Sequence, residues 1–98
     1  MARFDFIAVY ILTNHKRGTL YTGVTSDLPE RLVQHRSGEG SLFTGRYRTF
    51  RLVWFERHEE MAMALQRERR IKEWKRFWKI ELIEAGNPEW LDLSTELV

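Results

Sequence analysis

Hydrophobic residues occupy both alternating faces of the first regular segment, residues 6–13, which is rich in β-branched and aromatic side chains. Because neither face is polar, this pattern predicts a strand in the interior of a sheet. Residues 14–18 are polar and end in a glycine, and residues 19–25 again favour a strand. The two strands are therefore expected to pair as an antiparallel hairpin.

A helix is expected directly after this hairpin. Ser26 or Asp27 can serve as its N-cap, and Pro29 suits its first turn. Glu30 follows Asp27 at the spacing of a capping box, and Gly38 is a natural end for the helix. Three residues share one stripe of this helix and are candidates for its buried face: Leu28, Leu32 and His35.

The second half of the chain predicts a loop, a strand and further helix. Residues 38–49 hold three glycines, two threonines and two arginines, which indicates a basic loop. Residues 50–57 favour a third strand. Residues 59–85 contain no proline or glycine and have helical periodicity, in one long helix or in two joined near residues 74–76. Residues 86–88, Gly-Asn-Pro, end this helical region.

The order β-β-α-β-α-α predicts a small α/β (α+β) domain that takes in residues 1–98, with no repeat and no linker. The strand order is not predicted. There is no cysteine, which excludes disulfides, thiolate zinc sites and a cysteine nucleophile. The longest apolar run, residues 6–12, is far shorter than the roughly 20 residues of a membrane-spanning helix. We therefore expect a cytoplasmic protein without a signal peptide, and a monomer because no heptad pattern is present.

Charge is unevenly distributed, although 16 Lys and Arg nearly balance 14 Asp and Glu. Residues 31–51 carry five arginines and one acid, and residues 67–79 carry seven basic residues and two acids. Residues 80–98 carry five acids and no Lys or Arg. Two basic blocks in one small chain suggest a polyanion such as nucleic acid as the partner. A solvated basic helix face without a specific partner is the alternative.

Glu68 is the most informative residue of the second helical region, because its neighbours at helical spacing are Ala64, Leu65 and Ile71. An ionised carboxylate that faces a core must be paired or bind a metal ion. The metal interpretation makes Glu68 a candidate ligand. The alternative is an ion pair with one of the nearby basic residues: Arg67, Arg69, Arg70 or Lys72.

Arg31 and His35 lie one helical turn apart, so they share one side of the first helix. An arginine fork suits a phosphate, and a histidine can transfer a proton near neutral pH. Tyr10 and Tyr21 lie on the two hairpin strands, where their hydroxyls can reach a common rim. Gly23 interrupts the second strand and suggests a close approach of another group. A surface pair and ordinary packing tyrosines are the alternatives.

These residues fall in short segments whose order and spacing resemble the GIY-YIG nuclease domain, specifically a small stand-alone branch similar to the N-terminal nuclease module of the UvrC excision-repair subunit. The resemblance covers about residues 6–93. It departs from the family pattern at Ala8, Val9 and Thr22, while both motif tyrosines and the motif glycine remain. The segments that carry it are AVY (8–10), YTG (21–23), TSDL (25–28) with Arg31 and His35, ALQRE (64–68) with IK (71–72), and NPEWLDL (87–93).

The resemblance implies a three-stranded antiparallel sheet flanked by helices, and an endonuclease that hydrolyses DNA phosphodiester bonds with Mg²⁺ or Mn²⁺. Glu68 would hold this metal ion, and Arg31 would neutralise charge on the phosphate. Tyr21, or Tyr10 with it, would position or deprotonate the attacking water, and His35 would assist proton transfer or orient a tyrosine. Asn87 is also carried over as catalytic, although an Asn-Pro after a glycine is equally typical of a helix-ending turn.

DNA is the expected partner, with RNA as the alternative, and we expect little sequence preference and a role in repair or recombination. The phosphate-loop and dinucleotide patterns are absent, so no small-molecule cofactor is expected. A non-catalytic nucleic-acid-binding adaptor of the same fold is the competing function. A protein-docking surface formed by the four tryptophans is a third, although packing explains them more simply. The candidate phosphate contacts are Arg36, Arg46, Arg48, Arg51, Arg69, Arg70 and Lys72.

Overall fold

The computed structural model of the protein describes residues 6–37 and 50–97. The expected order of strands and helices is confirmed, with a further short 3₁₀ helix at the end that the sequence did not predict. The predicted basic loop at residues 38–49 lies outside the described residues, as does Gly38. The elements are β1 (Ala8–Thr13), β2 (Leu20–Thr25), α1 (Leu28–Arg36), β3 (Arg51–Arg57), α3 (Met61–Glu73), α4 (Arg76–Gly86) and η1 (Leu93–Leu97).

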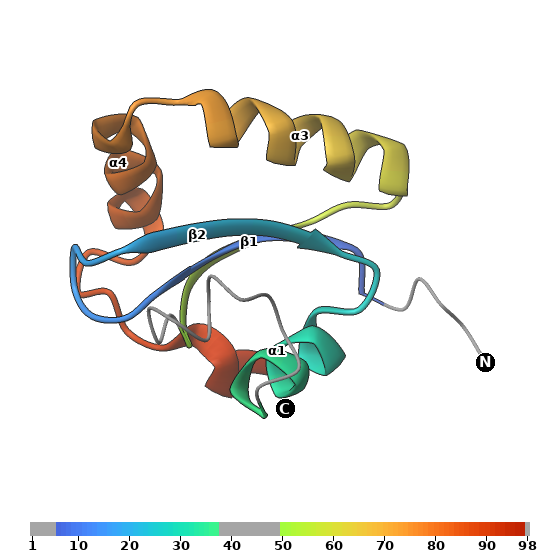
Figure 1. The fold of residues 1–98 in the computed structure, drawn as a ribbon, viewed down its shortest axis with the longest axis horizontal. Helices are drawn as coiled ribbons and strands as arrows, with labels where there is room; N and C mark the ends of the chain where they lie inside the picture. Colours follow the sequence, from blue (N-terminus) through green and yellow to red (C-terminus); the bar gives the residue numbers. More distant parts are fainter. Residues whose placement is uncertain (1–5, 38–49, 98) are drawn as a thin grey trace.

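The sheet is antiparallel, and its strand order is β2-β1-β3. Central β1 is covered on both faces, as its two apolar faces predicted. α3 and α4 lie over one face, while α1 and η1 lie over the other (Figure 1). Val9 and Ile11 pack toward α3 and α4, whereas Tyr10 and Leu12 pack toward α1. This alternation divides the core into two layers, one on each side of the sheet.

α1 begins as its sequence predicts. Asp27 is the N-cap, and its side chain accepts a hydrogen bond from the backbone N–H of Glu30 at 3.4 Å. Pro29 lies in the first turn, and Leu28, Leu32 and His35 form the buried stripe. The helix therefore presents one face to the sheet, and this face includes a histidine.

The second helical region is two helices, of which α3 ends at Glu73 and α4 begins at Arg76. Trp74 and Lys75 between them have extended backbone angles, although neither is a helix breaker. The Arg76 guanidinium donates hydrogen bonds to the carbonyls of Arg17 and Gly18 in the hairpin turn. Contacts between distant parts of the chain therefore hold the break in place.

The segment after α4 folds back onto the protein. α4 ends at Gly86, and Asn87 is its C-cap, as expected for the Gly-Asn-Pro sequence. Trp90 is fully buried in the core layer under α3 and α4, and its indole N–H donates to Glu84 Oε2 at 2.7 Å. Trp90 also has a positive φ of 58°, so burial of its ring outweighs an unfavourable backbone conformation. Among the helices of the described ranges, none is long and apolar enough to cross a membrane.

Replacing Trp90 with alanine is expected to lower the free energy of unfolding by about 3–5 kcal/mol, because it removes a large, completely buried side chain. Urea denaturation followed by circular dichroism measures this loss. The matched control is Leu91→Ala, since 64% of the Leu91 side chain is exposed. We expect Leu91→Ala to change stability by less than about 0.5 kcal/mol. Equal effects of the two substitutions would contradict the assigned role of Trp90.

Candidate active site

Three aromatic side chains from β1, β2 and α1 meet on the α1 side of the sheet. Tyr21 pairs with Leu12 across the hairpin, so it faces the same side as Tyr10, two residues earlier on β1. A hydrogen bond of 3.0 Å joins Tyr10 Oη and His35 Nε2. The Tyr21 ring lies 6.3 Å from the Tyr10 ring and 5.6 Å from the His35 ring, between centroids. The tyrosines and the histidine singled out in the sequence therefore form one cluster.

Gly23 allows the Tyr10 phenol to occupy this position. It pairs with Tyr10 in the sheet register, and an added Cβ at Gly23 would lie 2.5 Å from Tyr10 Oη and 2.6 Å from Tyr10 Cζ. Real Cβ atoms essentially never make contacts this short. The phenol thus lies over the backbone of the edge strand, where any side chain would collide with it. The sequence suggested that another group approaches Gly23 closely. That group is Tyr10, a catalytic candidate on the neighbouring strand.

Two charged groups from opposite faces of the sheet act on the same phenol. Arg31 lies on α1, where its positive charge acts on Tyr10, and its Nη1 donates to Gln34 Oε1 at 2.9 Å. Glu68 lies on α3, is 8% exposed, and is near enough for its charge to affect Tyr10. β2 is an edge strand, so side chains from the two faces can approach each other past it. The charges of Arg31 and Glu68 therefore both affect the hydroxyl that the aromatic cluster holds.

Burial raises the pKa of Tyr10 to about 12. The negative charges of Tyr21 and Glu68 act in the same direction, while Arg31 opposes them through its hydrogen bond and its charge. The Tyr10 hydroxyl is thus a neutral hydrogen-bonding group near pH 7. Because only 1% of Tyr10 is exposed, it is also poorly placed to reach a solvent molecule.

Burial also lowers the pKa of His35 to about 4, and the positive charge of Arg31 adds to this effect. His35 is therefore neutral near pH 7. A neutral imidazole can accept a hydrogen bond at Nε2 from the Tyr10 hydroxyl and so hold the phenol in place. Of the two roles expected from the sequence, orienting a tyrosine or assisting proton transfer, this arrangement favours the first.

Glu68 is partly paired within its own helix, because Lys72 Nζ lies 2.5 Å from Glu68 Oε2. The lysine was among the four partners proposed from the sequence. Its side chain is 54% exposed, so it can leave without uncovering a core. Among the described residues, no three His, Cys, Asp or Glu side chains are grouped to hold a metal ion. A single carboxylate still fits Mg²⁺, which keeps several water ligands and binds through one or two carboxylates and phosphate oxygens.

Asn87, the remaining catalytic candidate, has its side chain fully engaged elsewhere. Its Nδ2 donates to the carbonyls of Val53 at 3.1 Å and Leu91 at 3.0 Å. Its Oδ1 accepts from the backbone N–H of Leu91 at 3.0 Å. These bonds tie the end of α4 to β3 and to the following segment, which favours the turn interpretation of this residue.

The candidate phosphate contacts fall into groups with different surroundings. Arg36 is paired with Asp92 at 3.2 Å, and Arg51 donates to the carbonyl of Trp90, so both hold the C-terminal segment. Arg69 and Arg70 are exposed on α3, and no carboxylate pairs with either within the described residues. Lys72 is the partner of Glu68 described above. Two candidates lie outside the described residues: Arg46 and Arg48.

Two residues beside this cluster were not identified from the sequence. Gln34 holds the guanidinium of Arg31, and its spacing of three residues on the same helix was an available signal. Thr22 pairs with Ile11 and so faces α3, the side from which Glu68 comes. Its Oγ1 is buried and has no hydrogen-bond partner in the described part of the chain. No feature of the sequence indicated a role for the Thr22 hydroxyl.

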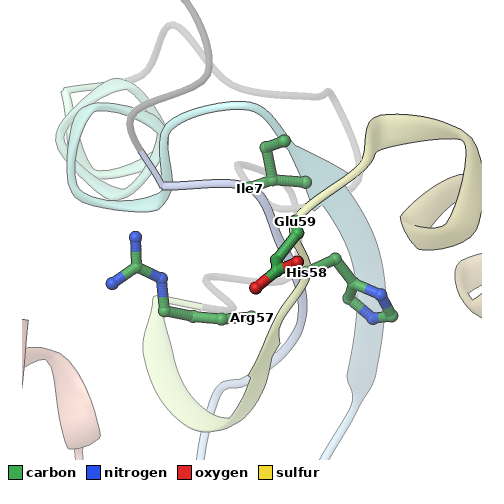
Figure 2. Close-up of a pocket in the computed structure, with 4 residues that line it drawn as sticks. All are labelled: Ile7, Arg57, His58 and Glu59. Carbon is green, nitrogen blue, oxygen red and sulfur yellow. The ribbon is translucent and has the colours of Figure 1, made fainter.

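Two hollows adjoin the sheet at the ends of its strands. One of about 360 Å³ borders Arg31 and is lined mainly by polar residues of β2 and α1. The other, of about 550 Å³, is lined by Ile7, Arg57, His58 and Glu59 (Figure 2). In Figure 2 the Arg57 and His58 side chains point to opposite sides, and His58 bonds Glu56 at 2.8 Å. Of these two hollows, the first is therefore the one lined by a candidate active-site residue, Arg31.

Gly23→Ala is expected to lower the free energy of unfolding by about 1–3 kcal/mol, because the new methyl group must displace a buried phenol held by His35. Thermal or urea denaturation measures the change. Gly86→Ala is the matched control, since an added Cβ there meets nothing within 4 Å. A Gly23→Ala protein as stable as Gly86→Ala would show that the phenol does not occupy the described position.

The stability of the protein is expected to fall as the pH drops from 6.5 towards 4. In this window the unfolded chain protonates His35 while the folded chain does not, so the contribution of the neutral ring is lost as pH falls. Unfolding midpoints across this window, compared between wild type and His35→Gln, isolate the effect from that of the carboxyl groups. NMR of the His35 ring protons should give a pKa of about 4. A midpoint near 6.5 would contradict the burial of this ring.

Comparison with known proteins gives the family of the chain. The pattern of the family described as the GIY-YIG catalytic domain matches residues 6–81. A UPF0213 protein of Staphylococcus saprophyticus is 38% identical over 71 residues, which is 72% of this chain and 87% of that protein. A UPF0213 protein of Oceanobacillus iheyensis is 38% identical over 81 residues, covering 83% of this chain and 93% of its own.

An archaeal relative, a UPF0213 protein of Haloquadratum walsbyi, is 38% identical over 82 residues, or 84% of this chain and 91% of that protein. No solved structure matches significantly. The family match covers both hairpin motifs, α1 and α3, and therefore all the elements that supply the tyrosine, arginine, histidine and glutamate cluster. The chain belongs to the GIY-YIG family of nuclease domains.

Proposed function

We propose that this protein is an endonuclease that hydrolyses DNA phosphodiester bonds with a divalent cation bound at Glu68. One observation carries the proposal: Tyr10, Tyr21 and His35 form one aromatic cluster within the matched nuclease segments, with Arg31 one turn before His35 on α1 and Glu68 buried on α3. A half-buried guanidinium and a buried carboxylate beside phenols suit phosphate hydrolysis. A purely structural cluster has no need of both charges.

Each side chain has a distinct part in this proposal. Tyr21 is half-buried on the edge strand, so it is the tyrosine that can contact an attacking water and take up its proton while passing the phenolic proton to solvent. Arg31 binds a non-bridging phosphate oxygen and stabilises the charge that grows there as the water oxygen attacks phosphorus. The bond to the leaving oxygen then breaks, and that oxygen takes up a proton. The cation, Mg²⁺ or Mn²⁺, would neutralise charge on the phosphate and on the leaving oxygen.

Tyr10 and His35 act as positioning residues. The raised pKa of Tyr10 keeps its hydroxyl neutral, and the lowered pKa of His35 keeps its ring neutral, so the bond between them persists near pH 7. This bond fixes the phenol on which the charge of Arg31 acts. We leave Asn87 out of the reacting group, because its amide is fully used in the fold.

DNA binding in this proposal relies on the exposed outer side of α3. Arg69 and Arg70 project from the helix that carries Glu68, and no described carboxylate neutralises them. Such cations bind the phosphate backbone without reading base sequence, so binding should weaken strongly with salt and depend little on sequence. The cellular process, repair or recombination, and a cytoplasmic location belong to the same proposal.

The ion pair between Lys72 and Glu68 favours a second candidate function. A lysine that stays on this carboxylate would exclude a cation, and the protein would then be a nucleic-acid-binding adaptor with the nuclease fold. Under the nuclease proposal, Lys72 moves away to bind phosphate when DNA and the cation arrive. Because the Lys72 side chain is exposed, it can either stay on Glu68 or move to a phosphate, and a cleavage assay distinguishes the two.

Glu68→Gln and Arg31→Ala are each expected to reduce cleavage at least about 100-fold, because each removes a charge used in the transition state. Labelled single-stranded, duplex, flap and branched DNAs, with Mg²⁺, Mn²⁺ or a chelator, provide the assay. Glu89→Gln is the control carboxylate, because Glu89 is exposed and lies on the segment after α4. It should cleave like wild type.

The same panel separates the two candidate functions when binding is measured beside cleavage. Metal-dependent cleavage that both substitutions abolish, while binding and folding persist, supports the nuclease. Binding of the wild-type protein without cleavage of any substrate in either metal supports the adaptor. In that case Glu68 would be a structural partner of Lys72.

A further inference from the structure

The junction between α3 and α4 carries a hollow of about 400 Å³, here called the elbow pocket. It is lined by Trp74, Trp78, Glu81 and Leu82. Trp74 packs against the core, and its ring contacts the Trp78 ring edge-to-face at a centroid distance of 6.3 Å. Trp78 keeps 50% of its surface exposed. Core packing therefore explains the other tryptophans of this chain better than it explains Trp78.

Two lysines directly follow the tryptophans of the elbow pocket in the sequence. Lys75 and Lys79 are one helical turn apart at the start of α4, and within the described ranges neither pairs with a carboxylate. Burial lowers the pKa of Lys79, and the nearby positive charges of Lys72 and Arg76 lower it further. Lys72 has Glu68 as its partner. Lys75 and Lys79, in contrast, lack a counter-charge among the described residues. A strand of phosphates would supply it.

The side chains that line the elbow pocket suit a nucleobase better than a phosphate group. Indole rings and a leucine suit the face of a planar ring, and the Glu81 carboxylate would repel a phosphate that entered. The same carboxylate can accept a hydrogen bond from the exocyclic amino group of a base, as Asp and Glu do from cytosine. Thymine has no such group. An aromatic face with cations at its edge is the usual combination for unpaired nucleotides.

We propose that the elbow pocket binds an unpaired base of the DNA substrate, stacked on Trp78, with Glu81 accepting from its amino group and Lys75 and Lys79 facing the adjacent phosphates. This inference rests on DNA being the substrate of the proposed function. Glu68 lies five residues, or about 7.5 Å, before the end of α3 at Glu73, and the pocket begins at the next residue, Trp74. At about 3.4 Å per stacked nucleotide, this rise corresponds to about two nucleotides. The substrate would therefore be single-stranded a few nucleotides from the scissile bond.

Binding in the presence of a chelator, where no cleavage occurs, tests this proposal. The probes are fluorescein-labelled oligodeoxycytidine, oligodeoxythymidine, oligoribocytidine and a duplex of equal length, followed by anisotropy. Trp78→Ala should weaken binding of oligodeoxycytidine about 10-fold, as expected for a lost stacking ring, and should leave the duplex unchanged. Trp78→Phe keeps a ring and should recover most of the affinity. Glu81→Leu should abolish a preference for cytidine over thymidine.

Phe77→Ala is the matched control, because Phe77 is the neighbouring aromatic residue, is 64% exposed against 50% for Trp78, and does not line the pocket. Equal effects of Trp78→Ala and Phe77→Ala would overturn the proposal, as would equal losses for single strand and duplex. Tighter Trp78-dependent binding of the ribonucleotide would overturn its assignment to DNA. A dimer in sedimentation that Trp78→Ala dissociates would assign the pocket to self-association.

Cleavage assays keep this inference separate from the proposed function. If DNA binding does not depend on Trp78 but metal-dependent cleavage is intact, the elbow-pocket proposal is rejected and the nuclease proposal stands. Trp78-dependent binding with no cleavage by the wild-type protein rejects the nuclease and leaves a single-strand-binding protein. Denaturation midpoints confirm that each variant is folded before either comparison is made.

Discussion

All six residues of β1 are buried, and this strand is hydrogen-bonded along both of its edges. No side chain on it can reach solvent directly, so any polar group that it carries must be satisfied inside the protein. Tyr10 is such a residue, and His35 is the partner that satisfies its hydroxyl. The candidate active site is thus built outward from a core tyrosine. Its precision derives from core packing rather than from surface loops.

Much of the fold follows from local patterns along the chain. The two apolar faces of β1 predicted a central strand, and Asp27 with Pro29 predicted the start of α1. The break at Trp74 was only one of two alternatives, because it depends on Arg76 reaching a hairpin turn almost sixty residues earlier. The pairing of β1 with β3 likewise joins distant segments, so the strand order had no local signal.

The candidate site was predictable where helix and strand periodicity set the direction of side chains. Tyr10 and Tyr21 share a face because residues alternate along paired strands, and Glu68 is buried because its neighbours are apolar. Periodicity gave no information on partners far away in the sequence. Asp92 pairs with Arg36, and the Val53 carbonyl accepts a hydrogen bond from Asn87, and neither partner had a signal in the sequence pattern.

The segment after α4 passes from one core layer to the other. Trp90 belongs to the layer beneath α3 and α4, while Leu93 and Leu97 pack into the layer that contains Tyr10. A short length of chain therefore packs against both sides of the sheet, and unfolding of one core layer removes contacts from the other. Such coupling makes unfolding cooperative across the molecule. The spatial arrangement of the catalytic candidates on the two faces is therefore gained and lost together, as the whole protein folds and unfolds.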